Sequence, residues 1–363
     1  MNRDSLLSLY DRFTQLVEKL PGGLQKPILR ELTPIRNVFF EQRPARLVLL
    51  GDNGSSVPEI LFTVCRQDVE TGKAENGWRR YRIPNRGEVL VLDARSETPQ
   101  PVVESALAGL KPDAALLVRE PGEESPATLE SAAARIALCP EEIPIVGLTR
   151  GSDSDRAKLA ATLAAHREFS RRRTSTHSGQ ADDSLAESLC ALLPDSARLE
   201  FARLAGAKKA QTEIAGSLLK SFTAVCGVIG LQPIPLADMP ILTALQTLMV
   251  SLIIHTSGKT ASPRLVAEFL AALGLSIGAG MLFRESARAI VKIIPIWGNA
   301  VSGFVAGVGT YAIGRAAIAY FIEDTPLTET KKLFHRLLPG WDTFRRRRLP
   351  ESKTGDRSIN PKP

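Results

Sequence analysis

A glycine-containing turn at residues 51–58 follows a short aliphatic run and has the layout of a phosphate-binding loop. Such a loop needs a Gly-Lys-Ser/Thr triplet, because the lysine neutralises phosphate oxygens, the hydroxyl holds Mg²⁺ and backbone N–H groups cradle the phosphates. Ser56, Val57 and Pro58 stand at the triplet in this chain. Val57 carries no charge, and Pro58 has neither a hydroxyl nor a backbone N–H. The turn therefore lacks the atoms that bind a triphosphate.

Ligands of open α/β sheets bind beyond the carboxyl ends of the strands, so the residues after each predicted strand are the next candidates. Asp93 ends the second predicted strand, where an aspartate would contact Mg²⁺ through water, but Ser96 stands where a glycine would sense the γ-phosphate. Thr149 follows the fourth predicted strand, and Asp153 lies one position beyond the carboxylate that would read a base. Residues 175–177 stand where a last base-contacting loop would come.

These loops predict no catalytic residue and no metal ligand. Any residual nucleotide contact would involve a small set of loop residues: Gly51, Gly54, Ser55, Asp93, Thr149 and Asp153. A nucleotide bound without the lysine would need a replacement cation. The candidates, which the sequence does not place, are Arg79, Arg80, Arg82, Arg95 and Arg150.

The elements that would position these loops alternate between strand and helix. Short aliphatic runs without strict alternation predict parallel strands covered on both faces, at 46–50, 88–92, 114–118 and 144–148. Helical spacing lies between them, at 58–66, 102–109 and 128–137. This rhythm predicts a doubly wound α/β sheet. The polar residues 151–183 read as a loop or as the last connection of the sheet.

Strand signals stop at residue 184, and the remainder of the chain reads as helix followed by a polar tail. Helices are predicted at 26–40, before the sheet, and at 184–193 and 197–216, after it. The predicted organisation is a helical lead-in, a degenerate α/β domain, a Gly/Ala-rich helical domain and a basic tail, with bounds 1–40, 41–195, 196–325 and 326–363.

Composition supports a globular protein with an uneven charge. The chain has 363 residues, with 44% apolar and 23% charged residues. Residues 1–200 carry a net charge of −3, whereas residues 201–363 carry +10. A basic half favours an anionic surface, either lipid headgroups or nucleic acid. Aromatic content is only 6%, so a groove for single-stranded nucleic acid is not expected. The start of the chain shows no signal-peptide core.

Three stretches in the second half lack Lys, Arg, Asp and Glu. Residues 239–258, 269–283 and 293–314 contain 20, 15 and 22 residues, and about 20 are needed to span a bilayer as a helix. Gly303, Gly307 and Gly314 would let another helix approach closely, as in membrane helix pairs. Two interpretations stay open, a membrane-associated helical domain and a soluble helical bundle with small residues at its contacts.

The sequence resembles the Era-like small GTPases of the translation-factor class. It is most similar to the branch fused to a C-terminal Gly/Ala-rich helical domain of unknown function, which occurs in membrane-associated GTPase-like proteins. The similarity covers roughly residues 30–325 and lies mainly in three segments: Ile35-Arg36 with Arg43-Pro44-Ala45-Arg46-Leu47-Val48-Leu49-Leu50-Gly51, residues 232–242, and residues 307–317. The departures concentrate in the nucleotide loops.

This resemblance implies a Ras-like, doubly wound P-loop-type domain followed by an all-α, membrane-associated domain. We expect a pseudo-GTPase, a non-catalytic scaffold or regulatory module of a bacterial cell. It would be tethered to a membrane lipid, a membrane protein or another protein partner, at the cytoplasmic face of the inner membrane. No cofactor is expected. The alternatives are an atypical GTP–Mg²⁺ binder with weak or no hydrolysis and a nucleic-acid-associated regulator, and homo-oligomerisation stays open.

Overall fold

The computed structural model describes most of the chain in six segments and a few positions near its start. They are residues 22–95, 97–122, 125–179, 184–230, 238–274 and 298–338, with residues 7, 8, 10, 11, 14, 15, 17 and 18.

The described residues form one seven-stranded sheet in the order β2-β3-β4-β1-β5-β6-β7. Strands β4, β1, β5, β6 and β7 run parallel, β3 runs antiparallel to β4, and β2 runs antiparallel to β3. The predicted α/β class is therefore correct at this level. The strand bounds are β1 (Ala45–Gly51), β2 (Glu70–Glu75), β3 (Trp78–Ile83), β4 (Gly87–Asp93), β5 (Ala114–Arg119), β6 (Ile145–Thr149) and β7 (Thr174–Ser178).

The four strands predicted from aliphatic runs are β1, β4, β5 and β6, the centre of the sheet. Three outer strands were missed. Every residue of β2 is exposed, and β7 consists of polar residues that are exposed or half-buried. Strand β3 interrupts its buried Trp78, Tyr81 and Ile83 with three arginines, so it has no aliphatic run. A turn signal for the β2–β3 hairpin was nevertheless present. Asn76 and Gly77 both have positive φ, at 50° and 81°, as the two-residue turn of a hairpin requires.

Helices cover both faces of the sheet and bury its aliphatic side chains. Helices α3, α8 and α9 pack on one face, and α4, α5 and α6 pack on the other. Parallel strands need this double cover because both of their faces are apolar. The bounds are α3 (Val57–Cys65), α4 (Gln100–Gly109), α5 (Pro126–Ile136), α6 (Asp153–Ala165), α7 (Arg167–Ser170), α8 (Ser184–Leu192) and α9 (Asp195–Ala205).

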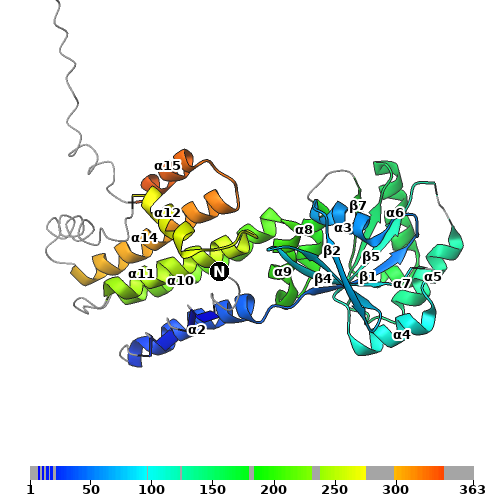
Figure 1. Cartoon of the computed structure of the whole chain (residues 1–363), viewed down its shortest axis with the longest axis horizontal. Helices are drawn as coiled ribbons and strands as arrows, with labels where there is room; N and C mark the ends of the chain where they lie inside the picture. Colours follow the sequence, from blue (N-terminus) through cyan, green and yellow to red (C-terminus); the bar gives the residue numbers. More distant parts are fainter. Residues whose placement is uncertain are drawn as a thin grey trace, which may run out of the picture.

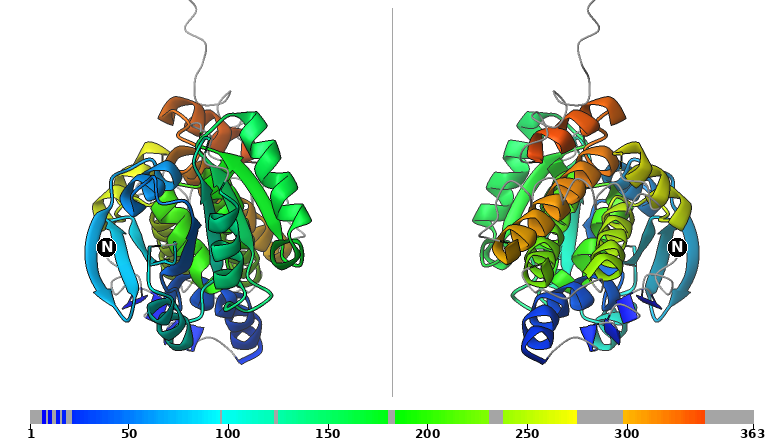
Figure 2. Two further views of the ribbon diagram at one scale, coloured as in Figure 1. Left: turned by 90° about the vertical axis from the view of Figure 1, so that its right-hand side faces the viewer. Right: turned by 90° about the vertical axis from the view of Figure 1, so that its left-hand side faces the viewer.

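The second unit is a helical bundle that extends from the sheet (Figure 1). Helices α10 and α14 pack side by side, with α11 against both, and α2 and α15 lie at opposite sides of the bundle (Figure 2). The bounds are α2 (Gly22–Phe40), α10 (Lys208–Gly230), α11 (Asp238–Thr256), α12 (Pro263–Ala272), α14 (Gly298–Phe321) and α15 (Leu327–Leu337).

The continuous helix predicted at 197–216 is wrong. Gly206 takes a left-handed conformation with φ of 66° and ends α9, and α10 starts afresh at Lys208. The carboxylate of Glu187 accepts hydrogen bonds from the N–H groups of Lys209 and Ala210, at 2.8 and 3.0 Å. A side chain from the sheet unit therefore caps the first turn of the long bundle helix.

The contacts of α9 and α2 indicate which unit each of these helices belongs to. Helix α9 packs on β4 and β1, and most of its buried side chains belong to the core of the sheet unit. Helix α2 shares its core with α10 and α11, so the lead-in joins the bundle although it precedes the sheet in sequence. The bundle is thus assembled from both ends of the chain.

Among the described residues, α10 is the helix that is long and apolar enough to cross a bilayer, and half of its apolar stretch is buried by the rest of the molecule. Of the three predicted stretches, 239–258 falls on α11. The side chains of Val250, Ile253 and Ile254 there are fully buried in the bundle core. The other two stretches lie partly outside the described residues. Gly307 packs closely on α10, since a Cβ there would lie 3.7 Å from the Cα of Gly227.

Candidate functional site

The candidate site lies where the strand order of the sheet reverses. After β1 the chain continues into α3 on one face, whereas after β5 it continues into α5 on the other. The carboxyl ends of these adjacent strands are therefore the position at which ligands bind in open α/β sheets. The loop 51–56 and the pair Arg119 and Glu120 lie at these two strand ends.

The first turn of the loop is held tightly against β5. Gly51 has φ of 101°, and a Cβ there would lie 2.0 Å from the carbonyl oxygen of Val118, so only glycine fits. The next side chain, Asp52, is only 3% exposed. Its carboxylate accepts a hydrogen bond of 2.9 Å from the N–H of Glu120 and pairs with Arg119 at 3.3 Å. The loop is therefore anchored by a buried carboxylate, which sequence reasoning missed.

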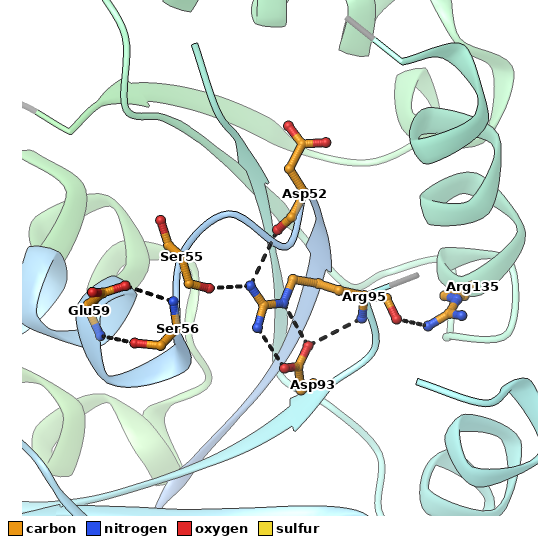
Figure 3. Close-up of polar contacts among 7 residues, drawn as sticks. All are labelled: Asp52, Ser55, Ser56, Glu59, Asp93, Arg95 and Arg135. Atoms are coloured by element: carbon orange, nitrogen blue, oxygen red, sulfur yellow. Dashed lines mark hydrogen bonds and ion pairs between the residues drawn. The ribbon is translucent and has the colours of Figure 1, made fainter. Parts of the chain in front are cut away.

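The guanidinium group of Arg95 fills the space enclosed by the loop (Figure 3). It donates to both carboxylate oxygens of Asp93, at 2.8 and 2.7 Å. It also donates to the backbone carbonyls of Asp52 and Ser55, at 3.3 and 2.5 Å. Burial lowers the pKa of Arg95, but the hydrogen bonds and charge of Asp93 outweigh this and raise it. Arg95 is thus a permanent cation whose donors are used inside the protein.

A second guanidinium holds the Arg95 segment from behind. Arg135 of α5 donates to the carbonyl of Arg95 at 2.5 Å (Figure 3). It also donates to the carbonyl of Thr98 at 2.8 Å. Both arginine residues are largely buried, at 7% and 8% exposure. The loop after β4 is therefore fixed by buried charge-assisted hydrogen bonds.

The helix after the loop begins with a capping box. The hydroxyl of Ser56 accepts a hydrogen bond from the N–H of Glu59 at 3.4 Å, and the carboxylate of Glu59 accepts one from the N–H of Ser56 at 2.8 Å. A side-chain carboxylate therefore lies where a phosphate loop would present a free N–H to a phosphate. The hydrogen bond from the Ser56 backbone lowers the pKa of Glu59. Val57 packs into the core between the sheet and the helices α3, α8 and α9.

The far side of the loop is closed by Glu120, which follows β5. Its carboxylate accepts a hydrogen bond from the hydroxyl of Ser55, and Arg150 donates to the same hydroxyl. Ser55 is only 1% exposed. A Cβ at Gly54 would lie 2.9 Å from Cγ of Glu120, so this side chain packs directly over the loop backbone. Glu120 could have been noticed as the carboxylate two positions after the third predicted strand.

The structure brings together most of the predicted nucleotide contacts. Gly51, Gly54, Ser55 and Asp93 all lie at the loop, linked by Arg95, Arg150 and Glu120. Thr149 is buried at the end of β6, where its hydroxyl accepts a hydrogen bond of 3.1 Å from the N–H of Gly151. Thr149 therefore stabilises the turn at residues 149–151 with its buried hydroxyl.

Asp153, by contrast, is not drawn into the loop. It is the first residue of α6, its side chain is 83% exposed, and it pairs with Arg156 at 3.2 Å. The helix start is a second capping box, formed by Ser152 and Asp155. The base-reading position is thus built as an ordinary helix N-terminus.

The residues expected to form a last base-contacting loop are instead in strand β7, which is a correction to the sequence interpretation. Residues 175–177 pair with β6 in parallel register. The Nδ1 atom of His177 lies 3.0 Å from the hydroxyl of Ser184. Their polar side chains gave no strand signal, because β7 is an edge strand with only half-buried positions.

Two of the five candidate arginines, Arg95 and Arg150, reach the loop. The other three lie on β3, where Arg80 pairs with Glu88 of β4 at 2.5 Å. Among the described residues, no group of His, Cys, Asp and Glu has the arrangement of a metal site.

The charge around the loop does not suit a nucleotide triphosphate with Mg²⁺. Asp93, the residue expected to approach the metal, already has both oxygens bonded to Arg95. The cations at the loop are already paired: Arg119 bonds Asp52, and Arg150 bonds the Ser55 hydroxyl that Glu120 accepts from. The carboxylates of Glu59 and Glu120 beside the loop would repel a polyanion. The residues present therefore do not fit Mg²⁺–GTP.

No protein-family model matches the chain, and no curated protein matches it either. The fold is a mixed α/β unit with a mostly parallel sheet, joined to a helical bundle. The geometry of the loop 51–56 is therefore the main evidence on function.

Proposed function

We propose that the chain is a pseudo-GTPase, a non-catalytic scaffold or regulatory module whose helical bundle tethers it to a membrane or to a partner. The observation that carries this proposal is the position of Arg95. Its guanidinium group occupies the space inside the loop and bonds both the loop carbonyls and the carboxylate of Asp93. The guanidinium group of Arg95, which belongs to the protein itself, therefore occupies the space that a bound nucleotide would need.

The assignment to a GTPase-like, P-loop-type architecture is supported by the order of the elements. The loop 51–56 joins the central strand β1 to α3 at the switch point of the sheet, and Asp93 ends the neighbouring parallel strand β4. The sequence similarity to the Era-like class points in the same direction. The binding chemistry of that class is what the loop residues of this chain lack.

The energetics oppose nucleotide binding. A triphosphate in this loop would lose the charge-assisted hydrogen bonds of the missing lysine, each worth about 1.5–3 kcal/mol. It would also have to displace Arg95 from Asp93 and to lie beside Glu59 and Glu120. These costs support a loop that stabilises the fold and presents a constant surface.

An atypical GTP binder is the second candidate, because Arg95 and Arg150 both lie at the loop. Such a protein would have to move Arg95 from Asp93 to the phosphates and swing Glu120 away. The two candidates therefore differ in one measurable property, the affinity for nucleotide.

The deciding experiment is calorimetric titration of the full chain with GTP and GDP in Mg²⁺, together with thermal denaturation in the same mixtures. The scaffold proposal expects no binding heat and no shift in Tm up to millimolar nucleotide. Micromolar affinity would overturn it. In that event, loss of binding in Arg150→Ala but not in Arg79→Ala would identify Arg150 as the substitute for the missing lysine.

We further propose that the tether acts at the cytoplasmic face of the inner membrane. The net charge of +10 in residues 201–363 would favour the anionic surface of a membrane. The half-buried apolar stretch of α10 supplies an apolar surface in the same part of the chain.

A further inference from the structure

A groove lies between α2 and α10. Helix α2 is on the side of the bundle opposite α15 (Figure 2). It contains two hollows of about 340 and 360 Å³. The first lies near the sheet, where α9 also lines it. The second lies farther out, and is lined by Lys26, Pro27, Ile28, Arg30, Glu31, Ala224, Val225 and Val228.

The floor of the groove is the incompletely buried side of α10. This helix has an apolar stretch long enough to cross a bilayer, yet only half of that stretch is buried. Ile214 and Val228 are half-buried and Ala224 is exposed, and all three line the hollows. Apolar surface of α10 is therefore available in the groove.

Cations lie at the outer hollow but are neutralised at the inner one. At the inner hollow, Arg198 pairs with Glu213 at 2.6 Å, and Asp195 lies beside them. At the outer hollow, Lys26 and Arg30 are both exposed on one side of α2, four residues apart. Neither makes an ion pair with a described residue.

The balance of charge at the outer hollow is positive. Lys220 is exposed on α10, one turn before Ala224, so it lies on the same side of the helix. The acidic residue at this hollow is Glu31. Two cations and one carboxylate line the hollow itself, and Lys220 lies one turn away on α10. This excess of positive charge around an apolar floor complements an anionic amphiphile, whose headgroup is negative and whose chains are apolar.

We propose that the outer half of the α2–α10 groove is a docking site for an anionic lipid surface. Lys26, Arg30 and Lys220 contact lipid phosphates, and Ala224 and Val228 face the acyl region. The inference rests on the tether proposed above for the helical unit and specifies where that tether lies. Each Lys or Arg near an anionic bilayer contributes about 1 kcal/mol to binding.

The test is flotation of the full chain with vesicles of 70% phosphatidylcholine and 30% phosphatidylglycerol, and with vesicles of phosphatidylcholine alone. We expect the wild type to bind the anionic vesicles and to lose binding at high salt. The double variant Lys26→Glu/Arg30→Glu should weaken the partition constant by about tenfold or more. Lys73→Glu/Arg79→Glu, which makes the same charge change on the β2–β3 hairpin, should change it by less than about threefold.

A separate variant tests the apolar floor. Ala224→Glu places a carboxylate in the hollow at an exposed helical position, so the fold should be retained, and a normal Tm checks this. It should also weaken binding to anionic vesicles by about tenfold. Binding that the two groove variants leave unchanged would overturn the inference while leaving a membrane tether elsewhere in the chain, and would make a partner helix the better occupant of the groove.

Wild-type protein that binds no anionic vesicle would overturn both the inference and the membrane tether. It would not affect the nucleotide-free scaffold, which depends on the calorimetric titration alone.

Discussion

Arg95 is the residue that separates this loop from a nucleotide-binding one. Its guanidinium group satisfies two loop carbonyls and both oxygens of Asp93. A planar fork with five donors can do this, whereas the ammonium group of a lysine cannot make the same bidentate contact. A side chain from the end of β4 thereby stabilises the turn after β1.

We expect Arg95→Ala to lower the free energy of unfolding by about 2–4 kcal/mol, because it leaves buried carbonyls without donors and Asp93 without its cation. The free energy of unfolding of Arg95→Lys should fall between that of Arg95→Ala and that of the wild type. Urea denaturation measures both, with Arg79→Ala, an exposed position on β3, as the control. A loss below about 0.5 kcal/mol in Arg95→Ala would show that the loop does not depend on this contact.

At the scale of the element, two helices that follow the loops begin in the same way. Helix α3 starts with the Ser56–Glu59 capping box and α6 with the Ser152–Asp155 box. In both, a carboxylate three residues into the helix accepts the first free N–H, and that hydrogen bond lowers the pKa of the carboxyl group. The N-terminus of each helix is therefore already bonded to a carboxylate of the same helix.

This pKa shift predicts a pH dependence. The pKa of Glu59 is lowered from 4.5 in the folded protein, so its contribution to stability is present above about pH 4.5 and is lost as the pH falls through the folded value. The difference in Tm between wild type and Glu59→Gln should therefore shrink between pH 6 and pH 3. Thermal denaturation across this range checks it, with Glu104→Gln, an exposed glutamate of α4, as the control. A difference that stays constant with pH would contradict the prediction.

At the scale of the whole molecule, the two units meet at a buried arginine. Arg203 of α9 donates to the carbonyl of His255 at the end of α11, at 2.8 Å, and to the carbonyl of Asn85 in the β3–β4 turn, at 3.3 Å. It also pairs with Glu200 at 3.3 Å, and Glu200 accepts a hydrogen bond from the N–H of Glu88. One side chain thus links sheet and bundle.

Arg203→Ala should lower the free energy of unfolding by about 2–4 kcal/mol and weaken the cooperativity between the units, because Glu200 loses its cation and two carbonyls lose their donor. Differential scanning calorimetry should then give a van't Hoff enthalpy below the calorimetric one. Arg264→Ala, an exposed position that pairs with Glu268 on the same helix, serves as the control. A single two-state transition at unchanged Tm would rule out this linking role.

Local sequence patterns were enough to locate the central elements of the sheet unit. Aliphatic runs located β1, β4, β5 and β6, and apolar spacing located α3, α4 and α5, because these elements bury most of their surface and leave a strong local pattern. The sequence also located the loop after β1 and showed that the loop has no lysine. The edge strands β2 and β7 were not predicted, because their residues are mostly polar and give no hydrophobic pattern.

Which side chains occupy the loop depends on contacts between residues that are far apart in the sequence. Arg95 and Arg150 reach it but Arg79 does not, and nothing in the local sequence distinguishes them, because the answer depends on which strand ends meet across the sheet. The same holds for Glu120 and Asp52, whose partners are more than sixty positions away. Residue types and local periods are properties of the chain, whereas the neutralisation of one charge by another requires the fold that brings them together.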